Sequence, residues 1–253
     1  MANTTDVRKT ALVTGGARGI GRAIVMELAD AGYNLVVNYN TSEEEALMLK
    51  DSLDNKGVSC LVIKADISSE VDVANMVDLA ISKYGRIDVL VNNAAYCNDA
   101  MFYDKKREEF VKTLETNVVG TWQLSRLVGE GMYRNGGGKI INIASTNGIN
   151  TYYPLCIDYD ASKAAIISLT HNLATQFKPY VNVNAVAPGF IATDSEVSAM
   201  DDEFVKLEEE KVMLGRAGRP EEVAKLVAFL ASSDSDFINN QVIAINGGVY
   251  GDV

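Results

Sequence analysis

Short apolar runs rich in valine and isoleucine alternate with longer segments of helical periodicity along this chain. Unbroken apolar runs of this kind are typical of strands that are buried on both faces. We expect seven such strands, at residues 10–14, 35–39, 59–65, 89–92, 139–144, 181–187 and 242–245. The patterns between them predict helices at residues 21–31, 42–55, 71–84, 108–134, 159–177 and 220–232.

Regular alternation of strand and helix predicts a parallel sheet. Two neighbouring parallel strands begin at the same end of the sheet, so the chain between them must cross back to that end, usually as a helix. No linker rich in proline, serine or glycine divides the sequence, and no block of it repeats. The pattern therefore predicts an α/β fold: a single doubly wound, Rossmann-like domain over residues 1–253. About seven parallel strands would carry helices on both faces.

The helix expected at 159–177 is apolar on more than one side, and carries Ile166, Ile167, Leu169 and Leu173 besides several alanines. A helix that covers one face of a sheet needs only one apolar stripe. The surplus favours burial against a second copy of the chain, so we expect a homo-oligomer. The alternative is that neighbouring elements of the same chain cover it.

Composition narrows the class of protein. Hydrophobic residues make up 47% of the chain, yet no apolar stretch approaches the ~20 residues of a membrane span. The N-terminal segment is polar and resembles no secretory signal, so we expect a cytoplasmic protein without membrane contact. The three cysteines form no CxxC pair, which predicts free thiols and neither disulfides nor a metal site. A single histidine, His171, argues against a histidine-rich metal centre.

The formal net charge of -11 excludes nucleic acid as an expected partner, because an acidic surface repels phosphates. Acidic residues are dense between 194 and 210, where we expect a loop covering the substrate. That loop suits a small neutral or cationic substrate better than an acidic carrier protein. A basic patch including Lys105, Lys106 and Arg107 would reverse this expectation.

A glycine-rich segment, TGGARGIG at 14–21, follows the first expected strand and opens the first helix. Its glycines permit a tight turn and a close approach of the backbone to a pyrophosphate, while the helix start attracts phosphate. This context predicts a dinucleotide site that includes Gly15, Arg18, Gly19, Ile20 and Gly21.

The end of the second expected strand should distinguish NAD from NADP. An acidic residue usually stands there in proteins that prefer NAD, whereas this chain has Tyr39, Asn40 and Thr41. With no carboxylate at those positions and Arg18 able to reach a 2′-phosphate, the sequence favours NADP(H) over NAD.

Tyr159 and Lys163 are four residues apart, so they share one face of a helix. A phenol has a pKa near 10, and a neighbouring ammonium lowers it toward the range useful for proton transfer. Ser145 follows an expected strand, where it can hydrogen-bond the same carbonyl oxygen. Asn117 lies inside an expected helix, where its side chain or a neighbouring carbonyl could hold a water in a proton relay to Lys163.

TGGARGIG, NNAA (92–95), Asn117, Ser145, YDASK (159–163) and NAVAPGFIAT (184–193) stand in the order and at the spacing of one family. Over nearly its whole length the chain resembles the short-chain dehydrogenase/reductase family, and it is similar to the 3-oxoacyl-carrier-protein reductases. Ala95 replaces a usual glycine, and Ile238-Asn239-Asn240 replaces a usual Ile-Thr-Gly turn.

The resemblance implies a catalytic tetrad and a homotetramer. The tetrad would consist of Asn117, Ser145, Tyr159 and Lys163. It also implies that the cofactor site extends beyond the glycine loop and the end of the second strand. The further residues would be Asp66 and Ile67 at the adenine, Asn93 and Ala94 at the wall, Lys163 at the ribose, Tyr159 beside it, and Pro188, Gly189, Ile191 and Thr193 near the nicotinamide.

The favoured function is hydride transfer between NADP(H) and a small-molecule carbonyl or alcohol. Reduction of a 3-oxoacyl carrier protein is one alternative, and a dinucleotide-binding sensor or scaffold without catalysis is another. An isomerase or epimerase is a third, although 253 residues leave little room for an extra substrate region. The segments 96–103 and 147–154 and the loop after Gly189 should shape the substrate pocket.

Overall fold

Seven parallel strands form one sheet in the computed structural model, which describes residues 8–150, 153–193 and 201–249. Their order across the sheet is β3-β2-β1-β4-β5-β6-β7. The strands are β1 Thr10–Val13, β2 Asn34–Tyr39, β3 Cys60–Lys64, β4 Val89–Asn92, β5 Gly138–Ile143, β6 Val181–Pro188 and β7 Val242–Ile245. The seven expected strands and their parallel arrangement are confirmed.

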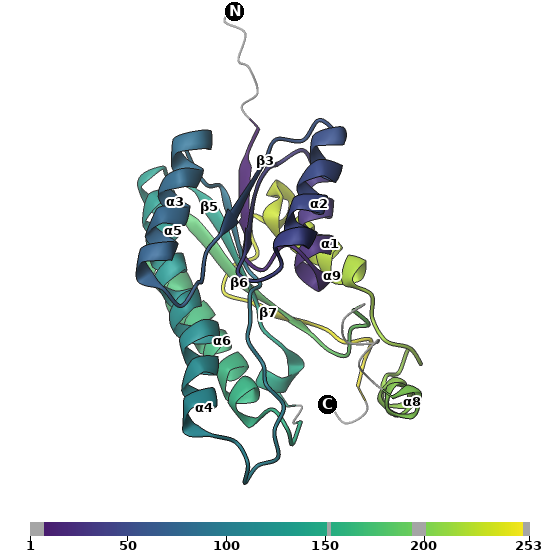
Figure 1. Cartoon of the computed structure of the whole chain (residues 1–253). Helices are drawn as coiled ribbons and strands as arrows, with labels where there is room; N and C mark the ends of the chain where they lie inside the picture. The colour runs from purple at the N-terminus through teal and green to yellow at the C-terminus, as the bar shows by residue number, and fades with distance from the viewer. Residues whose placement is uncertain (1–7, 151–152, 194–200, 250–253) are drawn as a thin grey trace, which may run out of the picture.

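Helices cover both faces of this sheet (Figure 1). On one face lie α1 Gly19–Asp30, α2 Glu43–Asn55 and α9 Pro220–Ala231; on the other lie α3 Glu70–Tyr84, α5 Thr121–Arg134 and α6 Ile157–Gln176. Alternate strand residues enter two cores, as β1 illustrates. Ala11 and Val13 belong to the core under α1 and α9, whereas Leu12 belongs to the core under α3, α5 and α6. Burial on both faces explains the unbroken apolar strands.

The chain winds in opposite directions from β1. It proceeds through β2 and β3 toward one edge of the sheet, and from β4 through β7 toward the other. In such sheets a crevice opens where the winding direction reverses, here between β1 and β4, beyond the carboxyl ends of the strands. These ends lie at the bottom of Figure 1, on the side of α8 Asp202–Lys211.

The expected helix at 108–134 is present as one unbroken helical run, but it is not α-helical throughout. It consists of α4 Arg107–Leu114, a π-helical segment η1 Glu115–Gly120, and α5. A π-helical turn widens the backbone and is frequent at functional sites. Asn117 lies in this π-helical segment. The asparagine inside the expected long helix thus coincides with a local change of backbone geometry.

The expectation of an acidic loop over residues 194–210 is wrong for its second half. Residues 194–200 lie outside the described part of the chain, but Asp202–Lys211 is helix α8. The Asp201 side chain accepts a hydrogen bond from the Glu203 amide at 3.1 Å, and Lys211 occupies the last turn. Acidic residues at the start of a helix and a cation at its end both interact favourably with the helix dipole. This charge pattern was the available sign of a helix, and the sequence analysis overlooked it.

The turn before β7 keeps a left-handed backbone although glycine is absent. Asn240 has φ 63°, and its Oδ1 lies 2.6 Å from Nδ1 of His171. Asparagine tolerates this conformation better than most residues, which explains how Asn240 replaces the family's usual glycine. His171 is therefore occupied in this turn, about 18 Å along α6 from Tyr159 at 1.5 Å per residue.

Candidate functional site

The glycine loop between β1 and α1 leaves no room for side chains. Gly15 and Gly19 have φ of +59° and +53°, in the left-handed region. A Cβ on Gly21 would lie 2.2 Å from the Gly15 carbonyl oxygen. Within the described chain, no side chain caps the N-terminus of α1 and no acidic residue occupies its first turn. The first amides of α1 are therefore suited to a phosphate.

Three polar side chains hold this loop in place. The Asn38 carbonyl oxygen Oδ1 accepts from the Gly15 amide at 3.3 Å, and Asn38 Nδ2 donates to the Ala65 carbonyl at 2.9 Å. Asn93 Nδ2 donates to the carbonyls of Thr14 and Gly15 at 2.9 and 3.1 Å. The Thr14 hydroxyl accepts from the amides of Asn93 and Ala94. The loop is thus fixed to the ends of β2 and β4 before any ligand arrives.

The sequence analysis included Asn93 and Ala94 in this site but missed Asn38. Asn38 is buried in a strand that otherwise reads as continuous apolar core. A buried amide in such a strand requires hydrogen-bonding partners, and this requirement was the available signal.

The end of β2 makes contacts within the protein that the sequence did not predict. The Tyr39 ring is buried with Ala17 and Ala46, and its hydroxyl hydrogen-bonds Glu43, the first residue of α2. Burial and the Glu43 charge raise the pKa of Tyr39. Residues 39–41 hold no carboxylate, as expected, but Glu43, four residues beyond Tyr39, places one beside this strand end. Thr41 is exposed and its carbonyl accepts from the Glu43 amide.

Asn40 and Asp66 meet across the ends of β2 and β3. Burial alone would raise the pKa of Asp66, but hydrogen bonds from Ser68 and Asn40 outweigh it and lower that pKa. The next residue, Ile67, is buried, and its carbonyl accepts a hydrogen bond from Gln123. A Cβ on Gly120 would lie 2.7 Å from the same carbonyl oxygen. The structure thus joins the expected adenine-side residues to η1 and α5.

Lys163 is buried between α6 and the end of β5. Its Nζ donates a 2.7 Å hydrogen bond to the Ile143 carbonyl and lies 5.2 Å from the centre of the Tyr159 ring. Burial lowers the pKa of Lys163 to about 8, while the charge of Cys97 acts to raise it. The expected pairing of Tyr159 and Lys163 on one helical face is present, and the ammonium is held against the strand that leads to Ser145.

Ser145 follows β5 and begins the short 3-10 turn η2 Thr146–Gly148, where its hydroxyl accepts from the Asn147 amide at 3.2 Å. A Cβ on Gly148 would lie 2.6 Å from the Lys163 carbonyl carbon, so this turn packs directly on the backbone of α6. The absence of a side chain at Gly148 brings Ser145 and the helix carrying Tyr159 to the same end of the sheet.

Asn117 commits its whole side chain to neighbouring groups. Its Oδ1 accepts from the Tyr96 amide at 2.6 Å, and its Nδ2 donates to the Tyr96 carbonyl at 2.9 Å and to Ser162 Oγ at 3.0 Å. The sequence analysis offered the Asn117 side chain or a neighbouring backbone carbonyl as the group that holds the relay water. The side chain already makes these hydrogen bonds, which leaves the carbonyl for that task. Asn117 instead clamps the segment after β4 to the helical residue beside Lys163.

The segment after β6 closes the other side of the crevice. Pro188 ends β6, and the Gly189 amide donates to the Ile245 carbonyl at 3.1 Å. The Ile191 side chain belongs to the apolar core, so it offers mainly its backbone to a ligand. A Cβ on Gly19 would lie 3.5 Å from the Thr193 methyl carbon, which places Thr193 against the glycine loop. Ile20 also packs against the core beneath α1.

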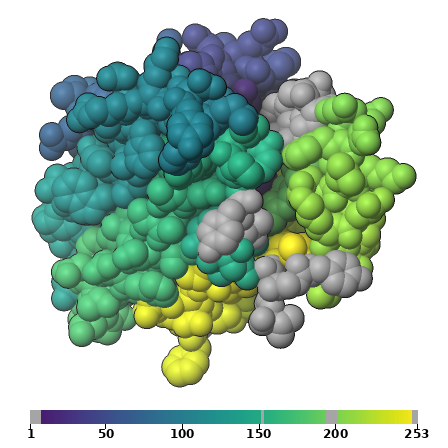
Figure 2. Space-filling view, turned by 90° about the horizontal axis from the view of Figure 1, so that it is seen from below, coloured from purple at the N-terminus to yellow at the C-terminus, as the bar shows by residue number. Residues whose placement is uncertain are grey.

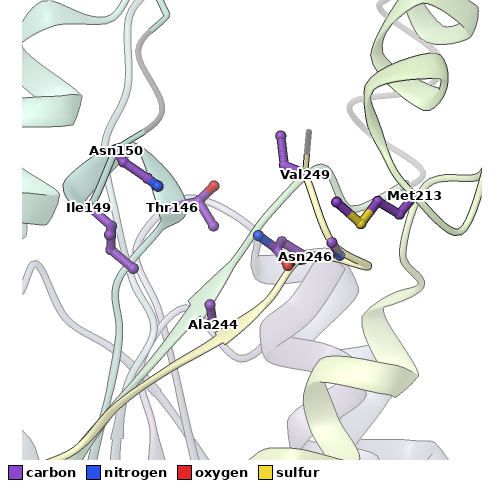
Figure 3. A pocket seen from close by; sticks show the side chains of 8 residues that line it. Thr146, Ile149, Asn150, Met213, Ala244, Asn246 and Val249 are labelled. Carbon is purple, nitrogen blue, oxygen red and sulfur yellow. Dashed lines mark hydrogen bonds between the residues drawn. The ribbon is translucent and has the colours of Figure 1, made fainter. Parts of the chain in front are cut away.

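A pocket of about 340 Å³ opens beside Ser145 (Figure 3). Its eight lining residues are uncharged: Thr146, Ile149, Asn150, Met213, Ala244, Asn246, Gly248 and Val249. Ile149 and Asn150 come from the expected segment 147–154, and Met213, which lies beyond α8, faces them from the opposite side in Figure 3; none of the described lining residues comes from 96–103. Residues beyond β7 form the floor and were missed, because they become neighbours of Thr146 only when the sheet assembles. In Figure 2, α8 in light green flanks this end of the molecule.

The possible basic patch near residue 105 is smaller than its sequence suggests. The Lys105 side chain is 4% exposed and pairs with the buried Asp158 at 3.0 Å. Asp158 also accepts from the Thr113 hydroxyl at 2.6 Å. Burial works against both charges, but their mutual contact lowers the pKa of Asp158 and raises that of Lys105. Lys105 therefore anchors the segment after β4 to α6 and does not contribute to a surface patch.

The sequence is similar to known proteins along nearly its whole length. A family model described as "Enoyl-(Acyl carrier protein) reductase" matches residues 15–250. The chain belongs to the short-chain dehydrogenase/reductase family. Members of this family are oxidoreductases that bind a nicotinamide dinucleotide, and the glycine loop, the uncapped α1 and the crevice at the strand ends fit such a cofactor.

Three relatives within this family are named as reductases of a 3-oxoacyl carrier protein or of acetoacetyl-CoA. The 3-oxoacyl-[acyl-carrier-protein] reductase FabG of Staphylococcus aureus is 38% identical over 243 residues, covering 96% of this chain and 98% of the relative. The FabG protein of Aquifex aeolicus is 36% identical over 244 residues, covering 96% and 97%. The acetoacetyl-CoA reductase of Rhizobium meliloti is 36% identical over 243 residues, covering 96% and 98%. The family model's description names a different acyl reduction, that of an enoyl group.

Proposed function

We propose that this short-chain dehydrogenase/reductase uses NADP(H) to reduce the 3-oxo group of a small acyl thioester or a similar small carbonyl. The observation that carries the proposal is the buried Lys163, which is held by the Ile143 carbonyl and lies beside the Tyr159 ring. A buried ammonium at this position lowers the pKa of the phenol, so Tyr159 can give a proton to a carbonyl oxygen. A protein that only binds a dinucleotide has no need of this pair.

Each member of the tetrad has a separate task in the proposed reaction. The nicotinamide, when bound, supplies the hydride. Ser145 donates a hydrogen bond to the substrate oxygen and orients it, while Tyr159 transfers the proton to that oxygen. Lys163 favours the phenolate that remains. Asn117 acts through position, since its side chain already clamps Tyr96 and Ser162, and we assign the relay water to its backbone carbonyl in η1.

The cofactor preference follows from two charges near the first two strands. Arg18 immediately precedes α1 and follows Ala17, which packs with Tyr39 at the end of β2. We propose that Arg18, Asn40 and Thr41 receive the 2′-phosphate of NADP(H). Glu43 opposes this preference but is engaged by the Tyr39 hydroxyl.

We propose that the substrate reaches the enzyme free of a carrier protein. The pocket beside Ser145 is lined by uncharged residues, α8 is rich in carboxylates, and Lys105 is buried. These features support a small neutral substrate, and they offer little attraction to an acidic carrier. The names of the FabG relatives support the carrier-protein substrate as the competing candidate.

We also propose that the enzyme works as a cytoplasmic homotetramer. Trp122 on α5 and Tyr180 after α6 are 45% and 48% exposed, on the helical layer formed by α5 and α6. No helix among the described residues is long and apolar enough to cross a membrane. Exposed aromatic side chains on one layer are typical of a surface covered by another subunit.

The deciding experiment follows cofactor oxidation by absorbance with a panel of carbonyl compounds. We expect NADPH-dependent turnover of acetoacetyl thioesters and little with unrelated sugars or steroids. Binding of NADPH without oxidation by any carbonyl would favour the sensor alternative. Conversion of a substrate without net cofactor oxidation would favour an isomerase.

A further inference from the structure

Two cysteines that are 59 residues apart in sequence lie side by side in the structure. Sγ of Cys97 is 3.2 Å from Sγ of Cys156, and both are free thiols. Cys156 Sγ also donates to Oδ1 of Asp99 at 2.8 Å, and Cys97 Sγ lies 3.5 Å from the same oxygen. Cys97 is exposed, whereas Cys156 is buried. The sequence offered no sign of this cluster, because neither spacing nor motif joins its members.

The pair connects the two segments that carry the proposed reaction centre. Cys97 follows Tyr96, whose backbone is clamped by Asn117. Cys156 immediately precedes α6 and stands three residues before Tyr159.

The same three groups have the ligand types of a metal site, with all ligand atoms within 4.8 Å of one another. The distance between the sulfurs favours a different chemistry. A tetrahedral zinc ion with Zn–S bonds of about 2.3 Å separates two sulfurs by about 3.8 Å. At 3.2 Å the sulfurs are closer than that, and about 1 Å beyond a disulfide bond. Structural zinc also takes four protein ligands, and this cluster offers three.

We propose that Cys97 and Cys156 form a reversible disulfide when the enzyme meets a hydroperoxide, and that the disulfide switches off the reaction centre described above. The cluster itself stands on geometry alone; only the effect on turnover rests on the proposed function. Disulfides in reducing compartments are usually transient and redox-sensing, so the proposal is compatible with cysteines that are free thiols.

The chemistry proceeds in two balanced steps. The exposed Cys97 thiolate attacks the distal peroxide oxygen, the O–O bond breaks, and the departing alkoxide or hydroxide takes a proton; Cys97 becomes a sulfenic acid. Cys156 then attacks Cys97 Sγ and passes its proton to Asp99. The S–S bond forms as the S–O bond breaks, and the leaving hydroxide takes that proton as water. Two thiols have lost two electrons in all, and the peroxide has gained them.

The order of the two thiols follows from their surroundings. The hydrogen bond with Cys97, burial and the contact with Asp99 all raise the pKa of Cys156. Cys156 is thus protonated and shielded while Cys97 is accessible, so Cys97 reacts with the peroxide first. Asp99 is a positioning and proton-accepting residue in this scheme.

Closing the bond must move the segment after β4 or the start of α6 by about 1 Å. That movement acts on the Asn117 clamp and on Tyr159, and a displacement of this size at a reacting group costs up to about 100-fold in rate. We therefore expect oxidation to lower kcat at least tenfold while leaving the glycine loop and its affinity for cofactor largely unchanged.

The test treats the reduced full-length enzyme with equimolar hydrogen peroxide and then alkylates the remaining thiols for mass spectrometry. We expect alkylated cysteines to fall from three to one, with Cys97 and Cys156 cross-linked inside one chain. Dithiothreitol should restore both the thiols and the turnover. Cys97→Ser should keep its turnover under peroxide, and Cys60→Ala, a buried cysteine in β3, should respond as the wild type does.

Several results would overturn the proposal. Oxygen addition to Cys97 without a cross-link, or a cross-link between chains, would exclude the intramolecular disulfide. Binding of one zinc ion per chain that protects both thiols and is lost in Cys97→Ser would identify a metal site instead. A cross-link that leaves kcat unchanged would refute the switch. If the reduced enzyme turns over no carbonyl, the proposed function fails, while the thiol count still decides whether the disulfide forms.

Discussion

The Lys163 ammonium donates a 2.7 Å hydrogen bond to the carbonyl of Ile143, the last residue of β5. This contact joins the helix that carries Tyr159 to the strand that leads to Ser145. It also encloses a charge that has lost its water, which is why the pKa of Lys163 is lowered to about 8. Burying the Lys163 ammonium in the proposed reaction centre therefore lowers the stability of the fold. Both the lowered pKa and the lost stability can be measured.

The free energy of unfolding should depend on pH through Lys163. Its folded pKa, about 8, lies below the unfolded value near 10.5. Between these values the unfolded state binds more protons, so the contribution of Lys163 to stability rises with pH. Relative to Lys163→Met, the wild type should gain up to about 1.4 kcal/mol per pH unit from pH 8 to 10. Urea denaturation of both proteins measures this difference. A difference that is flat or falls with pH would show that the ammonium is not desolvated.

Tyr159→Phe should lower kcat for carbonyl reduction by about 100-fold or more, because the ring is kept and only the proton donor is lost. The dissociation constant of the cofactor, measured by fluorescence titration, should stay within about twofold. The matched control is Tyr84→Phe, which removes a hydroxyl at the end of α3, outside the proposed site. Retention of more than a tenth of the wild-type turnover by Tyr159→Phe would contradict the assigned role.

The pH profile of turnover should follow the same lysine. As pH rises through about 8, Lys163 loses its proton and no longer favours the phenolate of Tyr159. We expect kcat for carbonyl reduction to decline above that pH. The decline must appear in a buffer series at constant ionic strength, with thermal unfolding monitored in parallel. A constant kcat up to pH 10 would show that turnover does not require the protonated Lys163.

NADPH should bind more tightly than NADH, and two substitutions should change the ratio in opposite directions. Arg18→Ala removes the cation that we assign to the 2′-phosphate and should reduce the preference. Glu43→Gln removes the opposing carboxylate beside Tyr39 and should increase the preference about two- to fivefold, the effect of roughly 0.5–1 kcal/mol at a partly exposed site. Calorimetric titration of both cofactors decides this. Equal or tighter binding of NADH by the wild type would refute the NADP(H) assignment.

A short 3-oxoacyl chain should be reduced faster as a small neutral thioester than on an acidic carrier protein. The chain carries a net charge of -11, and α8 contributes several of its carboxylates. Like charge slows the encounter, and salt screens the effect. Comparison of kcat/KM for both substrates at low and high salt is the measurement. A preference for the carrier that weakens with added salt would mean that the surfaces attract each other.

Light scattering should report a particle several times heavier than the 27.3 kDa chain. Trp122→Glu places a charge on the exposed layer of α5 and α6 and should shift the particle toward lower mass. Met48→Glu alters an exposed apolar residue of α2, on the other face of the sheet, and should have no such effect. A wild-type particle of one chain at micromolar concentration would end the proposal of a tetramer.

The sequence alone determined the parts of this protein that are written in local patterns. The seven strands follow from short apolar runs, because a strand buried on both faces needs no polar alternation. The glycine loop follows from the positions of Gly15, Gly19 and Gly21 after the first strand. The pairing of Tyr159 with Lys163 follows from helical geometry, since residues four apart lie on one face whatever surrounds them.

The tertiary structure decided everything that depends on residues meeting from distant segments. Asn38 holds the glycine loop, Asn117 clamps Tyr96, and Lys105 is removed from the surface by Asp158, because each finds its partner only when strands and helices pack. The meeting of Cys97 with Cys156 has the same origin. Hydrogen bonds, ion pairs and thiol contacts act over a few ångströms, so their partners are set by the folded arrangement and leave no periodic signal in the sequence.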